Sequence, residues 1–176
     1  HYSTLLQAFY ESQSIFLSGI YKRYGSIETA NIILCYARKT HLEIIRQREK
    51  DLNYNVSLEK FWENFYSINR PSEKITVIAK DTGIPKETVR RKIKNLTDNG
   101  FLIKDKKNNG YYWNLKQKEK KPYYDIIHKE TKNLSFFISK IINNLKLIKN
   151  NKDCCCLVTE EIESQFSFYW YHYLSC

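Results

Sequence analysis

Apolar side chains recur every three or four residues along most of the chain, which is the spacing of one face of an α-helix. The first stripe consists of Leu5, Phe9, Phe16 and Ile20, with Leu6 and Leu17 beside it. It predicts a helix over residues 1–24 that ends at Gly25. Ser26 is a suitable N-cap for a second helix that runs to about residue 52. The stripe of this helix consists of Ile27, Ala30, Leu34, Ala37, His41 and Ile45. His41 is expected to be a core or interface side chain, because no second His or Cys lies at metal-ligand spacing.

A third helix is predicted from Leu58 to about residue 69, with Ser57 as its N-cap. Its apolar positions are Leu58, Phe61, Trp62, Phe65 and Ile68. We expect this helix to be the wall against which the helices of the following segment pack. The Arg70-Pro71 pair ends it, because the residue before a proline disfavours helix.

The segment 72–115 is the most informative part of the chain. Ser72 is the predicted N-cap of a short helix with Ile75, Ile78 and Ala79 on one face. Thr82-Gly83-Ile84 breaks that helix, since glycine accepts a positive φ. Pro85 suits the first position of the next helix, 85–99, and Gly100 suits its end. This second helix would bury Val89, Ile93 and Leu96.

A hairpin is predicted directly after this helix. Phe101–Ile103 and Tyr111–Trp113 are short β-prone runs, and Asn109-Gly110 between them favours a tight turn. The order of helix, glycine turn, helix and hairpin is typical of a winged helix-turn-helix with a two-stranded wing over 101–115.

The outer face of the 85–99 helix carries the chemistry of a DNA reader. Arg and Asn can form bidentate hydrogen bonds with guanine and adenine in a major groove, and Lys can hold phosphates. The residues expected at or near bases are Thr88, Arg91, Lys94 and Asn95, and those expected at phosphates are Lys86, Arg90, Lys106 and Lys107. A polar helix face is also common on ordinary solvated helices, but the surrounding turn and hairpin favour DNA.

The run IAKDTGIPKETVRRKIKNLTDNGFL resembles the recognition segment of bacterial winged helix-turn-helix transcription regulators of the MarR and GntR kind. The shared features are an Ile-Ala pair, a TG(I/V)xxxTVxR turn and helix start, and a closing LxxxGF/L. The resemblance is confined to 72–115, and it implies that Lys86, Thr88, Arg90 and Arg91 lie at or near DNA. The long helical flanks resemble the MarR layout more than the GntR layout, in which a larger effector domain follows.

The net charge of +10 is concentrated in the middle of the chain. Residues 69–121 contain 15 Lys/Arg and 6 Asp/Glu, whereas residues 1–68 contain 8 and 7, and residues 122–176 contain 6 and 6. A polyanion bound to the middle segment would release condensed counterions, which favours a nucleic-acid partner.

The C-terminal third is predicted to be helical. The charged stretch 116–122 is either a solvated linker, which we favour, or a phosphate contact. A long helix from Tyr123 to about residue 150 carries an a/d seam that packs against the chain's own first helices or against a second subunit. The seam consists of Ile127, Leu134, Ile138, Ile141, Leu145 and Ile148. The stretch 150–153 would end this helix.

A last, aromatic helix is predicted over about 159–174. Its aromatic residues are Phe166, Phe168, Tyr169, Trp170, Tyr171 and Tyr173. They indicate core or dimer contacts. The alternative is a pocket for an aromatic or lipophilic effector, with His172 as a polar handle. The run Cys154-Cys155-Cys156 suggests a thiol sensor. Asp153 and Glu160 argue against it, because nearby carboxylates raise a thiol pKa.

No motif for a hydrolase, a nucleotide-binding loop or a metal site occurs in the sequence, so no enzyme, cofactor or metal is expected. The cysteine pattern favours a cytoplasmic protein, the lack of an 18-residue apolar run argues against a membrane span, and the resemblance to MarR and GntR regulators implies a bacterial protein.

The prediction is therefore a mostly α-helical homodimer that binds double-stranded DNA as a transcription regulator, with a small-molecule effector left open. Its predicted parts are N-terminal helices (1–56), a winged helix-turn-helix (57–116) and C-terminal helices (117–176), with the terminal parts forming the dimerisation region. The alternative is a winged helix used for protein interaction or in a replication initiator.

Overall fold

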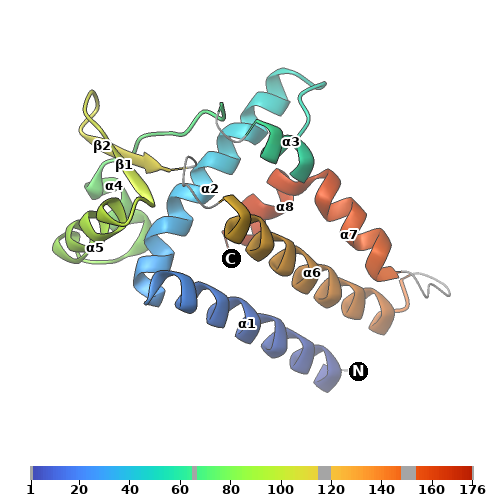
Figure 1. The fold of residues 1–176 in the computed structure, drawn as a ribbon. Helices are drawn as coiled ribbons and strands as arrows, with labels where there is room; N and C mark the ends of the chain where they lie inside the picture. Colours follow the sequence, from blue (N-terminus) through green and yellow to red (C-terminus); the bar gives the residue numbers. More distant parts are fainter. Residues whose placement is uncertain (1, 65–66, 115–119, 148–153, 176) are drawn as a thin grey trace.

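The computed structural model describes residues 2–64, 67–114, 120–147 and 154–175. It is mostly helical with one small antiparallel sheet of two strands (Figure 1). The elements in chain order are α1 (Tyr2–Tyr24), α2 (Ile27–Lys50), α3 (Leu58–Glu63), α4 (Ile75–Thr82), α5 (Lys86–Asp98), β1 (Leu102–Asp105), β2 (Gly110–Trp113), α6 (Lys120–Asn144), α7 (Cys154–Ser164) and α8 (Phe166–Tyr173). None of the described helices is both long enough and apolar enough to cross a bilayer.

Helix α2 lies at the centre of the fold. On one side it contacts α4, α5 and β2, and on the other it contacts α1 and α8 (Figure 1). Ten of its residues are buried, among them the fully enclosed Ile32, Ile33 and Tyr36. One cluster of buried side chains therefore runs from Ile78 and Ile93 in the middle of the chain, across α2, to Phe166 in the C-terminal third.

The predicted junction between the first two helices is confirmed. Gly25 has φ 75° and ends α1, because its left-handed backbone cannot continue a helix. Ser26 is the N-cap of α2, and its hydroxyl accepts a hydrogen bond from the backbone N–H of Thr29 at 3.1 Å. The predicted stripe of α1 is only partly correct, since Ile20 is buried but Phe9 is 42% exposed.

The middle of the chain forms two helices, with small differences from the prediction. Gly83 has φ 68° and ends α4 before α5 begins, as expected. The N-cap of α4 is Lys74 rather than Ser72, because residues around Glu73 pair with β2 before the helix begins. Pro85 is the N-cap of α5 rather than its first residue; its carbonyl accepts from the N–H of Val89 at 3.0 Å.

The end of α5 is closed by two backbone hydrogen bonds. Gly100 has φ 76°, and its N–H donates to the carbonyl of Thr97 at 3.0 Å. The N–H of Phe101 donates to the carbonyl of Leu96 at 2.8 Å. This is the Schellman arrangement, which satisfies the last carbonyls of the helix and turns the chain directly into β1.

The hairpin is present, and a third segment extends it. Leu102 pairs with Trp113 and Asp105 pairs with Gly110, so the turn contains residues 106–109. Asn109 has the positive φ, 51°, whereas Gly110 lies in the strand. Glu73 and Tyr111 exchange backbone hydrogen bonds of 2.8 and 2.9 Å. A Cβ on Gly110 would lie 2.5 Å from Ser72 Oγ, so glycine is required here for close approach.

The predicted role of α3 is wrong. This helix ends at Glu63 rather than near residue 69, and it contacts α7 and α8. The wall behind α4 and α5 is provided by α2 instead. Ser57 is the N-cap of α3, as predicted, and accepts from the N–H of Lys60 at 3.3 Å.

The predicted seam of α6 is buried at its N-terminal end and becomes more exposed towards its C-terminal end, with Ile138 and Ile141 half-buried. Ile127 and Leu134 are buried, whereas Leu145 is 56% exposed, and Ile148 lies outside the described residues, as do 116–119 of the connector and the stretch 150–153. The face packs against α1 and α7 of the same chain. It also buries Ser135, whose hydroxyl donates to the carbonyl of Thr131 at 2.8 Å.

The predicted last helix is two helices, α7 and α8, separated at Gln165. This break directs Phe166 and Trp170 into the core. His41 lies in the same core, as predicted for a core histidine: its ring stacks on Phe61 at 5.2 Å and meets Phe166 edge-on at 5.4 Å. Burial lowers the pKa of His41 to about 3.

Candidate nucleic-acid interface

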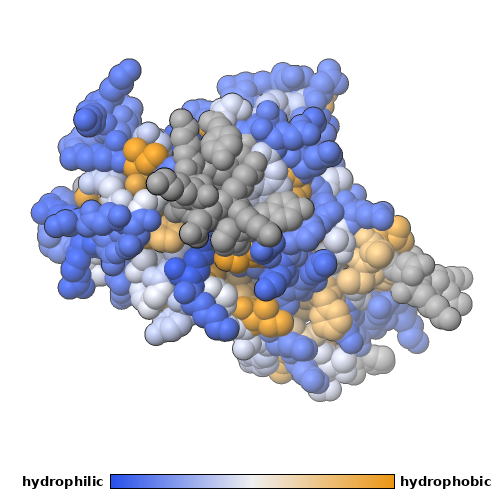
Figure 2. All heavy atoms as spheres, viewed as in Figure 1, coloured by the Kyte–Doolittle hydropathy of each residue, from blue (hydrophilic) through white to orange (hydrophobic). Residues whose placement is uncertain are grey.

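The outer face of α5 is open to solvent. Val89, Ile93 and Leu96 are buried beneath it, which is the stripe expected from the sequence. Lys86, Arg90, Arg91, Lys94 and Asn95 are all exposed, and Thr88 is half-buried. A space-filling view shows hydrophilic residues gathered over α5 and over the tip of the hairpin (Figure 2). The predicted base-contacting residues therefore share one accessible surface.

Two of these side chains have partners within the helix. Arg90 Nη1 lies 3.5 Å from Glu87 Oε1, an ion pair between two well-exposed groups, which contributes little to stability. The side-chain amide of Asn99 donates to the Asn95 carbonyl at 3.0 Å and also to the Asn95 side-chain oxygen. The Asn95 side-chain oxygen therefore already has one donor, and its second lone pair remains to accept from a base.

The hairpin that follows α5 carries two more exposed cations. Lys106 and Lys107 are exposed in the turn between β1 and β2. Asp105 orders that turn, because its carboxylate accepts from the N–H of Lys107 at 2.9 Å and from the side-chain amide of Asn108 at 2.8 Å. The backbone N–H of Lys107 is the main reason that the pKa of Asp105 is lowered. The lysine side chains thus project from a fixed turn.

Lys92 anchors α5 to α2 and was not among the expected functional residues. Its ammonium donates to Ser26 Oγ at 3.0 Å and to Thr29 Oγ1 at 3.2 Å, and it lies 3.1 Å from Glu28 Oε2. All three partners belong to the first turn of α2 or its cap. The sequence does carry one signal, since a helical wheel places Lys92 beside Leu96 at the edge of the buried stripe.

Lys39 holds the other helix of the pair in the same way. Its ammonium lies 3.0 Å from Glu73 Oε1 and 2.9 Å from Asp81 Oδ2, which bracket α4 at its two ends. The three side chains are only partly exposed, by 18% (Lys39), 21% (Glu73) and 27% (Asp81). Both helices of the candidate interface are therefore fixed to α2 by a lysine as well as by apolar packing.

In comparisons with known proteins, no protein-family model, no curated protein and no solved structure matches the chain.

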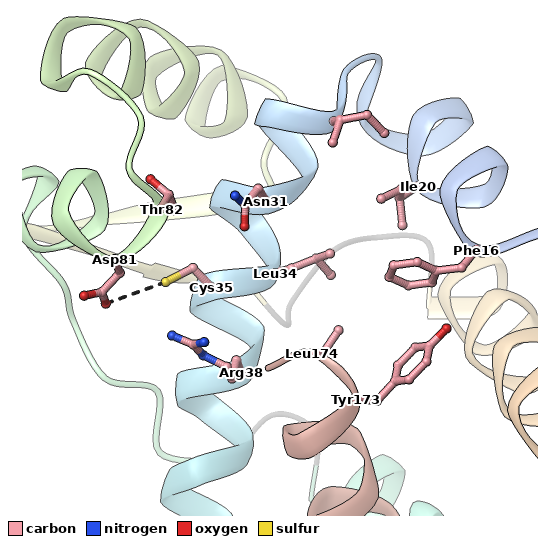
Figure 3. A pocket seen from close by; sticks show the side chains of 11 residues that line it. Phe16, Ile20, Asn31, Leu34, Cys35, Arg38, Asp81, Thr82, Tyr173 and Leu174 are labelled. Carbon is pink, nitrogen blue, oxygen red and sulfur yellow. Dashed lines mark hydrogen bonds between the residues drawn. The ribbon is translucent and has the colours of Figure 1, made fainter. Parts of the chain in front are cut away.

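A pocket of about 210 Å³ lies between α1, α2, the end of α8 and the end of α4 (Figure 3). Leu34, Phe16 and Tyr173 form part of its apolar wall, and Arg38 and Asn31 lie along its polar side. His172, the polar handle expected for an effector, is not among the lining residues.

The four cysteines that the structure describes do not form a cluster that could hold a metal. Cys154 is buried, and Cys155 and Cys156 are exposed at the start of α7. Cys35 is buried on α2, and its thiol points to Asp81 Oδ2 at 3.9 Å. Burial raises the pKa of the Cys35 thiol. Among the described residues, no group of three or more His, Cys, Asp or Glu could hold a metal ion.

Proposed function

We propose that this protein is a sequence-specific transcription regulator that binds double-stranded DNA as a dimer through a winged helix-turn-helix. Helix α5 would enter the major groove, with Thr88, Arg91, Lys94 and Asn95 at or near bases. Lys86, Arg90, Lys106 and Lys107 would contact phosphates.

The observation that carries the proposal is the outward-facing cationic surface of α5, followed in the chain by a hairpin with an exposed Lys-bearing turn. A major groove about 12 Å wide admits one helix, and α5 buries only one stripe of its circumference. Its rigid attachment to α2 supports the same function, because base recognition needs side chains held in a fixed register. The excess positive charge of residues 69–121 supplies the electrostatic attraction.

The test begins with selection of bound sites from a random pool of duplexes, followed by affinity measurements with purified variants. Arg91→Ala is expected to weaken binding to the selected site by about 1–3 kcal/mol and to relax the sequence preference. Lys107→Ala is expected to weaken binding to selected and random duplexes alike and to lower the salt slope by about 1.

Lys129→Ala is the matched control, because Lys129 is an exposed lysine on α6, away from the proposed interface. Equal losses for Arg91→Ala and Lys107→Ala on every duplex would contradict the assignment of α5 as the recognition helix. Wild-type binding that is insensitive to salt would contradict a nucleic-acid partner and favour a protein-interaction module.

A further inference from the structure

Helix α1 has a second apolar stripe besides the face that it buries. The buried face contains Ala8, Ser12 and Ile20 and packs against α2 and α6. Four large apolar side chains lie on another side, within about 60° of one another at 100° per residue. They are exposed by 37% (Leu6), 63% (Tyr10), 43% (Leu17) and 58% (Tyr21). These four residues are called the α1 stripe below.

The α1 stripe carries no charge. The only charged residues of α1 are Glu11, Lys22 and Arg23, and the helical wheel places all three outside this arc. Charged residues are depleted in the buried centre of protein interfaces, and aromatic residues are enriched there. An exposed apolar stripe of this kind therefore marks an interaction surface rather than a solvated helix face.

The spacing of the α1 stripe is symmetric, and this points to the partner. Reversing the helix about the midpoint between Gln13 and Ser14 exchanges Leu6 with Tyr21 and Tyr10 with Leu17. A two-fold interface must be complementary to itself, with residue i on residue j and j on i. An antiparallel second copy of α1 meets that condition, because each tyrosine faces a leucine.

We propose that the α1 stripe is the surface on which two copies of this chain pair, with the two α1 helices antiparallel. This inference deepens the proposed function, since it rests on a DNA-binding dimer and names the surface that forms it. An aromatic side chain buries roughly 150–250 Å² when fully covered, and Tyr10 and Tyr21 are about 60% exposed, so these two alone would supply on the order of a quarter of the ~800 Å² per partner of a standard interface.

The arrangement sets the distance between the two DNA-binding helices. The C-terminal end of α1 meets α2 at Gly25, next to the site where Lys92 anchors α5, and the N-terminal end lies at the opposite side of the molecule (Figure 1). An antiparallel pair would place the two α5 helices at opposite ends of the seam. A helix of 23 residues is about 35 Å long. Because α5 lies beyond the C-terminal end of α1 (Figure 1), the two α5 helices would be separated by at least about one helical turn of DNA.

The test is the oligomeric state of purified full-length variants by light scattering at micromolar concentration. Wild type is expected to be a dimer and Leu17→Glu a monomer, with the dimer dissociation constant raised at least about 100-fold because a carboxylate would be buried against Tyr10 of the partner subunit. Ile15→Glu is the matched control. Ile15 is 51% exposed on the same helix, but it lies on the opposite side from the stripe, so this variant is expected to remain a dimer.

A second measurement tests the antiparallel pairing itself. Tyr10→Lys alone is expected to be monomeric, and a mixture of Tyr10→Lys with Leu17→Glu is expected to recover a heterodimer, since position 10 of one copy faces position 17 of the other. Dimers that survive Leu17→Glu, equal loss of dimer in Ile15→Glu, or a failed mixture would overturn the α1 seam. Circular dichroism establishes that each variant keeps its helices.

DNA binding separates the two proposals. A monomeric Leu17→Glu that retains salt-dependent binding to a single half-site supports both proposals. A wild-type dimer that dissociates in Leu17→Glu but binds no duplex keeps the α1 seam and overturns the DNA-binding proposal. A wild-type monomer that binds duplex DNA overturns the seam and leaves the recognition helix intact.

Discussion

Glu130 is a carboxyl group placed where its charged form is disfavoured. It lies on α6 close to Arg23 and Tyr24, beside Gly19 of α1, whose Cβ position is 3.9 Å from Glu130 Oε1. Burial raises the pKa of Glu130 from 4.5 to about 7, and the positive charge of Arg23 offsets only part of that rise. Burial of Tyr173 likewise raises the pKa of that side chain, and the negative charge of Glu130 adds to the rise.

Glu130 is therefore expected to make stability depend on pH. Between about pH 4.5 and 7 the folded state holds a proton that the unfolded state releases, so the free energy of unfolding should fall as pH rises through this range. Glu130→Gln should remove that dependence and should be more stable than wild type at pH 8, by on the order of 1–3 kcal/mol. Urea unfolding at pH 5 and pH 8 measures it.

Glu160→Gln on α7 is the control for the pH experiment, because Glu160 is exposed. A wild-type protein with equal stability at both pH values would contradict the environment assigned to Glu130.

At the scale of single residues, the sequence predicted more about exposure than about partners. The eight candidate DNA-contacting side chains are exposed or half-exposed, because the periodicity of α5 and the hairpin turn decide this locally. The involvement of Lys92 and Lys39 in ion pairs could not be predicted. Their partners Glu28 and Asp81 are distant in sequence, and only the packing of α4 and α5 on α2 brings them together.

Among the elements, α5 depends on its attachment through Lys92. Lys92→Met should lower the free energy of unfolding by about 1–2 kcal/mol, because Ser26 and Thr29 lose a charged donor and Glu28 loses its cation. Thermal unfolding measures the loss. DNA affinity should fall as well, since α5 would be held less firmly.

Lys94→Met gives the contrast on the same helix. Lys94 is exposed, so its removal should weaken DNA binding while leaving the melting temperature almost unchanged. If Lys92→Met and Lys94→Met shifted the melting temperature equally, the anchoring role of Lys92 would be excluded.

The hairpin depends on the close approach of the chain at Gly110. Gly110→Ala would place a Cβ 2.5 Å from Ser72 Oγ and 3.0 Å from the Glu73 carbonyl oxygen, so the backbone pairing of Glu73 with Tyr111 should be disturbed. We expect a loss of about 1–3 kcal/mol in the free energy of unfolding. Chemical denaturation gives the value.

Asn109→Gly in the same turn should be almost neutral, because Asn109 already has φ 51° and glycine adopts this conformation readily. A Gly110→Ala variant as stable as Asn109→Gly would mean that the Ser72–Glu73 segment can move away without cost.

Element boundaries were predicted well where a local signal exists. Gly25, Gly83 and Gly100 all have positive φ and end their helices as expected. The extent of α3 and the split between α7 and α8 were missed. No glycine or proline marks Gln165, and the break is needed to direct Phe166 and Trp170 into the shared core.

On the scale of the whole molecule, the proposed dimer predicts the form of the DNA site. Selected sites should be pseudo-palindromes whose half-site centres lie about 10–10.5 base pairs apart or a multiple of that, because the α1 seam would hold the two α5 helices at one fixed separation on the same side of the duplex. Insertion of five base pairs between the half-sites turns one of them to the far side of the duplex. Gel-shift titration should then show binding to one half-site only.

A site whose two halves tolerate any spacing would contradict a rigid α1 pair. Direct repeats in place of inverted repeats would contradict the two-fold symmetry on which that pair depends.

The sequence by itself determined the helical class of the protein, the buried stripe and polar outer face of α5, and the hairpin that follows, since all of these depend on periods and turns within a few residues. Tertiary structure alone decided that α2 rather than α3 backs α4 and α5, that the seam of α6 faces its own chain, and that α1 keeps an apolar stripe in solvent. Several helices of this chain have apolar faces of similar size, and each face could pack against more than one of the others. Only the packing of the complete core selects which of them are in contact.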